Sequence, residues 1–181
     1  MKSSQFYQKY KSELVPKIMA DLGYTNLYKV PKITKIVINV GIGRFVKEPH
    51  YIENVEKVLA RISGQKPVRT KAKKSISNFK IREGMEIGVK VTMRGPRMYH
   101  FLEKLLSVTL PRVRDFHGVP ENGFDNQGNY TMGFKENVAF PEVKMEELEK
   151  VHGLQLIFAT TAKNKKEGKA LLTNLGFPFT K

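Results

Sequence analysis

The chain has 181 residues, with 32 Lys or Arg against 17 Asp or Glu, and a formal net charge of +15. Such a field attracts a polyanion or an anionic membrane surface. The sequence has no apolar run of the about 20 residues that a membrane span needs, and no apolar signal-peptide core at its start. Because cysteine is absent, disulfides, thiolate metal sites and thiol catalysis are excluded. We therefore expect a cytoplasmic protein without a membrane partner.

The N-terminal third is predicted to form a helix, a strand and a second helix. Pro16 lacks an N–H donor, so the first helix should kink or restart near residue 15. The run "ITKIVINVGIG" at 33–43 indicates a strand that two glycines end, and the second helix should stop at Gly64. The apolar residues that recur every four positions in the first helix are Phe6, Tyr10, Leu14, Ile18 and Leu22.

The rest of the chain is predicted to contain two more strands, each followed by a helix. The strands cover 87–95 and 154–162. The helix after the first strand begins at Pro96, and the last helix is closed by Gly176. Between them, residues 117–134 are rich in Gly and Asn and are interpreted as a long excursion.

The few strands have unequal faces, which favours an antiparallel sheet with helices packed on one face and hence an α+β fold. Residues 87–94 place Ile87, Val89, Val91 and Met93 on one face and Lys90, Thr92 and Arg94 on the other. The length favours one domain over 1–181, with an N-terminal half of about 1–84 and a C-terminal half of about 85–181 packed as one unit.

The first strand repeats this pattern. Ile36, Ile38 and Val40 should face the core, while Lys35 and Asn39 share the opposite face with Val37. This polar face is either an ordinary solvated surface or a platform for nucleic acid. Neutral groups such as Asn39 and Thr92 beside lysines favour the platform, because they can bond sugars and base edges.

A basic loop, "TKAKKSISNFKIREG" at 70–84, carries five cations and one acid. It is interpreted as a flexible cationic loop for phosphate, with a solvated loop or a nuclear-import-like signal at "KAKK" as alternatives. Phe79, flanked by Ile76 and Ile81, is expected to pin the loop to the body; stacking on a sugar or base is the alternative.

The sequence lacks the pattern of an active site, and we expect no catalytic residue, no metal ion and no cofactor. "GIG" at 41–43 has Val46 where a dinucleotide fingerprint needs its third glycine. Asp125 and Glu136 have the spacing of a calcium loop, but Tyr130 replaces the obligatory glycine. The histidines show no metal-binding spacing and are expected at the surface or as caps: His50, His100, His117 and His152.

Several motifs together resemble one family. They are "PKITKIVINVGIG", "ISGQKPVRTKAKKSISNFKIREG", "IGVKVTMRG", "LPRVRDFHGV", "FDNQGNYTMG", "FPE", "GLQLIFATTA" and "GFPF". They stand in the order seen in the bacterial large-subunit ribosomal protein family that binds 5S rRNA, numbered five among large-subunit proteins. The resemblance covers roughly residues 5–181. It implies an α+β fold of RRM-like outline in the central protuberance of the ribosome.

The resemblance also implies partners and site residues. The partners are 5S rRNA, large-subunit rRNA, P-site tRNA, small-subunit ribosomal protein thirteen and neighbouring large-subunit proteins. Contacts to 5S rRNA are expected from Lys35, Asn39, Gln65, Lys66, Lys90 and Thr92. Contacts to tRNA are expected from Lys71, Lys73, Lys74, Ser75, Ser77, Asn78, Lys80 and Arg82. The chain is thus expected to be a structural constituent of the cytoplasmic ribosome and not an enzyme.

Residues 109–146 look too polar for core, and the resemblance implies that this segment meets the small-subunit protein in an intersubunit bridge. The residues expected there are Arg112, Arg114, Asp115 and Glu142. Glu142, Glu146, Glu147 and Glu149 form an acidic cluster, which is either a solvated helix face or a docking patch. The alternative function is a nucleic-acid-processing enzyme that uses the same basic surface; it would need converging carboxylates or a metal site nearby.

Overall fold

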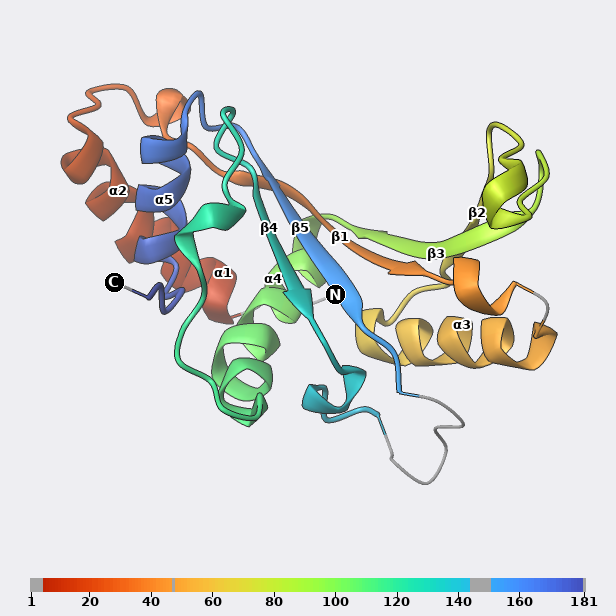
Figure 1. Ribbon diagram of the computed structural model, residues 1–181. Helices are drawn as coiled ribbons and strands as arrows, with labels where there is room; N and C mark the ends of the chain where they lie inside the picture. Colours follow the sequence, from red (N-terminus) through yellow and green to blue (C-terminus); the bar gives the residue numbers. More distant parts are fainter. Residues whose placement is uncertain (1–4, 47, 144–150, 181) are drawn as a thin grey trace. The chain divides into compact units, whose positions relative to one another are not determined.

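The computed structural model describes residues 5–46, 48–143 and 151–180 (Figure 1). Its strands form one five-stranded antiparallel sheet in the order β2-β3-β1-β5-β4. The strands are β1 (Ile33–Gly41), β2 (Val68–Lys71), β3 (Glu86–Met93), β4 (Tyr130–Phe134) and β5 (Leu154–Thr160). The sheet and its helices confirm the predicted α+β class, and the outline is consistent with the predicted RRM-like arrangement.

The helices lie close to the predicted positions. They are α1 (Gln5–Lys9), α2 (Val15–Leu22), α3 (Pro49–Ser63), α4 (Gly95–Lys104) and α5 (Lys165–Asn174). The described residues also form single turns: η1 (Tyr10–Leu14), η2 (Leu27–Lys29), η3 (Gly43–Phe45), η4 (Ser77–Phe79), η5 (Leu105–Thr109), η6 (Leu110–Arg112), η7 (Glu121–Gly123) and η8 (Asn137–Ala139).

The predicted kink of the first helix is confirmed. A π-helical turn, η1, separates α1 from α2, and Pro16 lies in the first turn of α2. A π-helical turn also follows α4: η5 precedes Pro111, which lies in η6. A proline cannot donate to the preceding turn, so a wider turn before it lets the chain continue in a helical direction.

The contacts divide the chain into two units, each built from several segments. Unit 1 consists of Met1–Ile36, Met93–Met132 and Ile157–Lys181. Unit 2 consists of Val37–Thr92 and Gly133–Leu156. Each unit therefore draws on both predicted halves of the chain, and the packing of those halves as one domain stays a prediction.

In unit 1 the core is centred on Tyr130, which is fully buried. Its hydroxyl donates a hydrogen bond to the carbonyl oxygen of Pro120 at 2.8 Å, and burial raises its pKa to about 12. The aromatic rings around it are those of Phe124, Phe158, Phe177 and Phe179. The interpretation of 117–134 as an excursion is therefore wrong at its end, because this polar stretch leads into β4.

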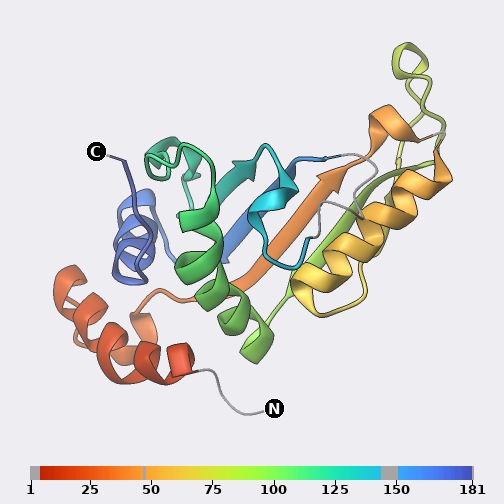
Figure 2. The same cartoon turned by 90° about the horizontal axis from the view of Figure 1, so that it is seen from below.

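In unit 2, α3 runs along one face of β3 and the adjoining part of β1 (Figures 1 and 2). It buries the side chains of Tyr51, Ile52, Val55, Val58, Leu59 and Ile62. On the strands, the predicted core residues Ile38, Val40, Val89 and Val91 are all at most 1 % exposed. The alternation read from the sequence is thus confirmed, and it leaves the opposite face of these strands without a helix among the described residues of unit 2.

Candidate nucleic-acid interface

The open face of unit 2 is the side of β1, β2 and β3 that points away from α3. The register of the antiparallel pair β2–β3 places Thr70 opposite Gly88 and Val68 opposite Lys90. Asn39 on β1 and Thr92 on β3 lie on the same side by the alternation of each strand. The open face is therefore defined by Asn39, Val68, Thr70, Gly88, Lys90 and Thr92.

Gly88 is buried at the centre of the open face, beneath polar side chains of its neighbours. A Cβ on this residue would lie 2.7 Å from Thr70 Oγ1, 3.2 Å from the Val40 carbonyl oxygen and 3.9 Å from Asn39 Oδ1. The polar side chains of Asn39 and Thr70 thus converge over a position that has no side chain of its own. Sequence reasoning missed Thr70 and Gly88, because it did not identify β2 as a strand; a register for β2 against β3 would have found both.

Gln65 is held beside Thr92. Its side-chain amide donates a hydrogen bond to the Thr92 carbonyl oxygen at 2.8 Å. The Ser63 hydroxyl, which is buried, donates to the carbonyl oxygens of Leu59 and Gln65 and so fixes the turn after α3. The structure therefore brings Gln65 and Thr92 together, two of the residues expected to contact 5S rRNA.

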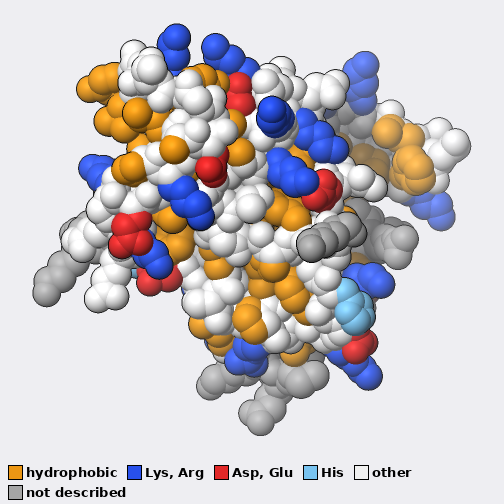
Figure 3. All heavy atoms as spheres, turned by 90° about the vertical axis from the view of Figure 1, so that its left-hand side faces the viewer, with side chains coloured by type: hydrophobic (Ala, Val, Ile, Leu, Met, Phe, Trp, Pro, Cys, Tyr) orange, Lys and Arg blue, Asp and Glu red, His pale blue; other side chains and the backbone are white. Residues whose placement is uncertain are grey.

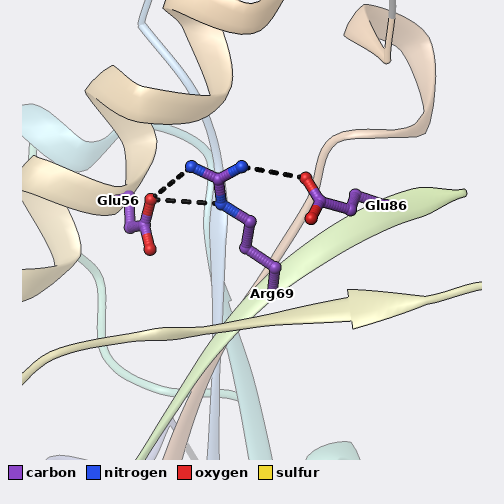
Figure 4. Close-up of polar contacts among 3 residues, drawn as sticks. All are labelled: Glu56, Arg69 and Glu86. Atoms are coloured by element: carbon purple, nitrogen blue, oxygen red, sulfur yellow. Dashed lines mark hydrogen bonds and ion pairs between the residues drawn. The ribbon is translucent and has the colours of Figure 1, made fainter.

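Arg69 anchors β2 on the side opposite the open face (Figure 4). Its guanidinium donates to Glu56 on α3 at 2.8 and 3.2 Å and to Glu86 on β3 at 3.0 Å. The hydrogen bond to Glu56, joined by the one to Glu86, raises the pKa of Arg69. These two carboxylates are turned towards Arg69, which leaves the open face without an acidic side chain among its residues.

The three lysines expected to contact 5S rRNA occupy different positions. Lys90 is exposed on the open face, and Lys66 is exposed in the turn between α3 and β2. Lys35 is half-buried on β1 and belongs to unit 1. Unit 2 alone therefore contains five of the six expected residues.

The basic loop has a defined backbone. Ile76 and Ile81 exchange two backbone hydrogen bonds at 2.9 and 3.1 Å around η4, with Lys80 in the left-handed region at φ +53°. At the base of the loop, the Ala72 N–H donates to the Met85 carbonyl oxygen at 2.8 Å. Ser75 Oγ accepts from the Glu83 N–H at 2.9 Å. The loop is thus a small hairpin that continues β2 and β3.

All eight residues expected to contact tRNA lie exposed on this loop. Phe79 is 72 % exposed and Ile76 is 46 % exposed. The expectation that Phe79 pins the loop to the body is therefore wrong. The alternative, stacking on a sugar or base, stays open.

The residues expected at the intersubunit bridge are divided between the units. Arg112, Arg114 and Asp115 are exposed in unit 1, and Glu142 is half-buried in unit 2. Arg114 Nε lies 3.9 Å from Asp115 Oδ2, but both side chains are so exposed that this ion pair contributes little stability. The expectation that residues 109–146 are too polar for core is wrong. Fully buried residues in this segment include Thr109, Tyr130, Asn137 and Phe140.

The described residues hold no group of three or more His, Asp or Glu side chains that could bind a metal ion. One histidine differs from expectation: His152 is buried, at 7 % exposure, and its ring meets Tyr51 edge-on. Burial lowers the pKa of His152. Of the acidic cluster, Glu146, Glu147 and Glu149 lie outside the described residues.

The helices in the described ranges are all too short or too polar for a membrane span.

Comparison with known families gives two matches that together cover most of the chain. The family described as "Ribosomal protein L5" matches residues 26–82, and the model of the C-terminus of the same ribosomal family matches residues 86–179.

Individual relatives match over nearly their full length. The large ribosomal subunit protein uL5 of Acholeplasma laidlawii is 52 % identical over 179 residues, which is 99 % of both chains. Its counterpart in Caldanaerobacter subterraneus is 53 % identical over 178 residues, covering 98 % of this chain and 99 % of the relative. That of Streptococcus pneumoniae is 51 % identical over 179 residues, which is again 99 % of both chains. The chain therefore belongs to the ribosomal protein L5 family.

Proposed function

We propose that this protein holds 5S rRNA in the large ribosomal subunit through the open face of unit 2. Membership of the family makes it a structural constituent of that subunit, located in the ribosome. The proposal that the open face binds 5S rRNA rests on the composition of this face. It presents neutral hydrogen-bonding groups and an exposed lysine around Gly88, and the carboxylates of Glu56 and Glu86 are bound to Arg69 on the other side.

A polar sheet face without a covering helix fits RNA for a physical reason. The minor groove of an A-form helix is wide and shallow and displays 2′-hydroxyls and base edges. Asn39, Thr70 and Thr92 can bond these groups, while Lys90 and Lys66 can meet the flanking phosphates. Gln65 is preorganised for the same purpose, because one amide hydrogen already bonds the Thr92 carbonyl and the side chain keeps a second hydrogen and its oxygen.

The test is the affinity for 5S rRNA of three variants, Asn39→Ala, Gln65→Ala and Thr92→Ala, over a range of salt concentrations. Each should lose about 1–3 kcal/mol of binding free energy, because a group buried against RNA loses its partner. The salt dependence should stay nearly unchanged, since no charge is removed. Lys90→Gln is the matched comparison and should reduce the salt slope. Wild-type affinity in all three alanine variants contradicts the proposal.

The basic loop is proposed to contact P-site tRNA. Its lysines are exposed on a hairpin, so they can act as point charges on phosphates without reading bases. Ser77 and Asn78 lie in the exposed turn η4 and add adaptable donors. Phe79, exposed beside them, supplies a ring that can stack on a ribose or an unpaired base.

The exposed segment around Arg112 and Arg114 is proposed to contact small-subunit ribosomal protein thirteen. A bridge that shifts as subunits rotate should be small and polar, because a large apolar interface resists sliding. A crosslinker placed at Arg114, in assembled ribosomes, should reach the small-subunit head. Crosslinks confined to the large subunit contradict this part of the proposal.

The competing function is that of a nucleic-acid-processing enzyme that uses the same surface. Such an enzyme would cleave or modify the RNA that it binds. Incubation of the pure protein with labelled 5S rRNA and magnesium separates the two. Binding without cleavage or modification supports the structural role, and turnover supports the enzyme.

A further inference from the structure

Tyr28 is 96 % exposed, and its neighbour Leu27 is 57 % exposed. Both lie in η2 of unit 1, just before β1. Nearly complete exposure of an aromatic ring forgoes the stabilisation that burial gives. The ring therefore contributes little to the fold and is available to a partner.

The turn that carries Tyr28 is held on both sides. Before it, the Tyr24 hydroxyl donates to Glu167 Oε1 at 2.9 Å. After it, Lys32 and Thr161 exchange hydrogen bonds: the Lys32 N–H donates to Thr161 Oγ1 and the Thr161 N–H to the Lys32 carbonyl oxygen, both at 3.0 Å. The backbone N–H of Tyr28 itself donates to Asn26 Oδ1 at 2.9 Å. The segment thus presents Tyr28 from a fixed turn beside the start of α5 (Figure 1).

Exposed lysines lie on this turn and on the segment that is hydrogen-bonded to its two flanks. The exposed cations on residues 24–32 and 161–167 are Lys29, Lys32, Lys163, Lys165 and Lys166, and Glu167 is the acid of these two segments. Glu167 is engaged, because it accepts from Tyr24 and from the Lys163 N–H. Figure 3 shows Lys and Arg side chains next to hydrophobic ones along the upper part of this side of the protein.

Two of these lysines have positions that the helix itself disfavours. Lys165 and Lys166 occupy the first turn of α5, where the helix dipole favours acids over cations. The Asn164 side chain already accepts from the Glu167 N–H at 2.9 Å, so the helix end is capped without them. A cationic first turn is unfavourable in the free protein and becomes favourable next to a polyanion.

We propose that Tyr28 and the five lysines form a second RNA-binding surface, the Tyr28 surface, which takes an unpaired base and its flanking phosphates. Tyr28 stacks on the base, and the lysines neutralise the backbone on either side. The chemistry favours RNA over a protein partner, because one aromatic ring among lysines matches the stacking-and-phosphate pattern of single-stranded RNA. This surface shares no residue with the open face or the basic loop.

The test measures binding of a short probe to the full chain alone and again with 5S rRNA added, so that the result does not depend on where 5S rRNA binds. The probe is a short oligouridylate that carries one photoreactive 5-bromouracil. Its crosslink should map to Tyr28, and its affinity should fall about tenfold in Tyr28→Ala and stay near wild type in Tyr28→Phe, which keeps the ring. The double variant Lys165→Gln/Lys166→Gln should reduce the salt slope by up to about one per lysine.

The controls separate stacking from other kinds of contact. Leu27→Ala removes the adjacent apolar side chain and should leave the affinity for the probe unchanged. An equal loss in Leu27→Ala, or an unchanged affinity in Tyr28→Ala, overturns the proposal. Binding of 5S rRNA itself should be unaffected in all these variants, so the result is independent of the function proposed for the open face.

Discussion

Single residues of the open face were predicted in part: the sequence placed Asn39, Lys90 and Thr92 there, but it did not show how these side chains are held. Asn39 and Thr92 follow from strand alternation alone. The bond from Gln65 to the Thr92 carbonyl joins residues 27 positions apart, and no local pattern encodes it. The convergence of Asn39 and Thr70 over Gly88 depends on the register of β2 against β3. β2 has only four residues and no clear alternation of apolar and polar side chains, so its register was not evident from the sequence.

Gly88→Ala should destabilise the protein by about 1–3 kcal/mol, because the added methyl group overlaps Thr70 Oγ1 and presses on the Val40 carbonyl. The measurement is the free energy of unfolding from thermal or denaturant melts. Thr70→Ala combined with Gly88→Ala should recover part of the loss, since one of the two close contacts is gone. A Gly88→Ala variant as stable as wild type shows that the strands do not approach as described.

His152 should make the stability depend on pH. Burial lowers its pKa in the folded chain, so between that value and about 6.5 the unfolded chain binds a proton that the folded chain does not. The free energy of unfolding should therefore be constant above neutral pH and fall as the pH drops below it. His152→Phe keeps an aromatic ring against Tyr51 and should flatten this slope. An unchanged slope in that variant assigns the pH dependence to other groups.

Among the helices and strands, those with a long apolar periodicity were predicted correctly, and the short polar strands were missed. The kink near Pro16 followed from the missing N–H donor, and α3 from its buried stripe. β2 and β4 were missed. β2 holds four residues, of which two are cationic, and β4 follows a Gly- and Asn-rich stretch. In both, tertiary pairing overrides weak local propensity.

The lysines of the basic loop should affect the binding of tRNA and leave the fold unchanged. Replacing Lys71, Lys73, Lys74 and Lys80 with glutamine should leave the fold and 5S rRNA binding intact, because these side chains are exposed and the loop is closed by backbone hydrogen bonds. In ribosomes that carry this variant, P-site tRNA should dissociate faster, and by a similar factor for different tRNAs. An unchanged dissociation rate at physiological salt would show that the loop is an ordinary solvated segment that does not hold tRNA.

Across the whole molecule, which has a net charge of +15, three surfaces carry cations in different chemical surroundings. The open face combines one lysine with neutral hydrogen-bonding groups, the basic loop carries point charges on long side chains, and the Tyr28 surface adds an aromatic ring. The sequence predicted a polyanionic partner from this charge, and the family match agrees with it. The sequence did not predict how the cations group into surfaces, because that depends on which residues the fold brings together.

Site-specific photocrosslinking to 5S rRNA tests directly whether the open face binds this RNA. A photoreactive amino acid replaces Lys90 on the open face in one variant and Lys57, exposed on α3, in the other; both positions belong to unit 2. Position 90 should crosslink to 5S rRNA, and position 57 should not. Crosslinks from position 57 with none from position 90 would contradict the proposal.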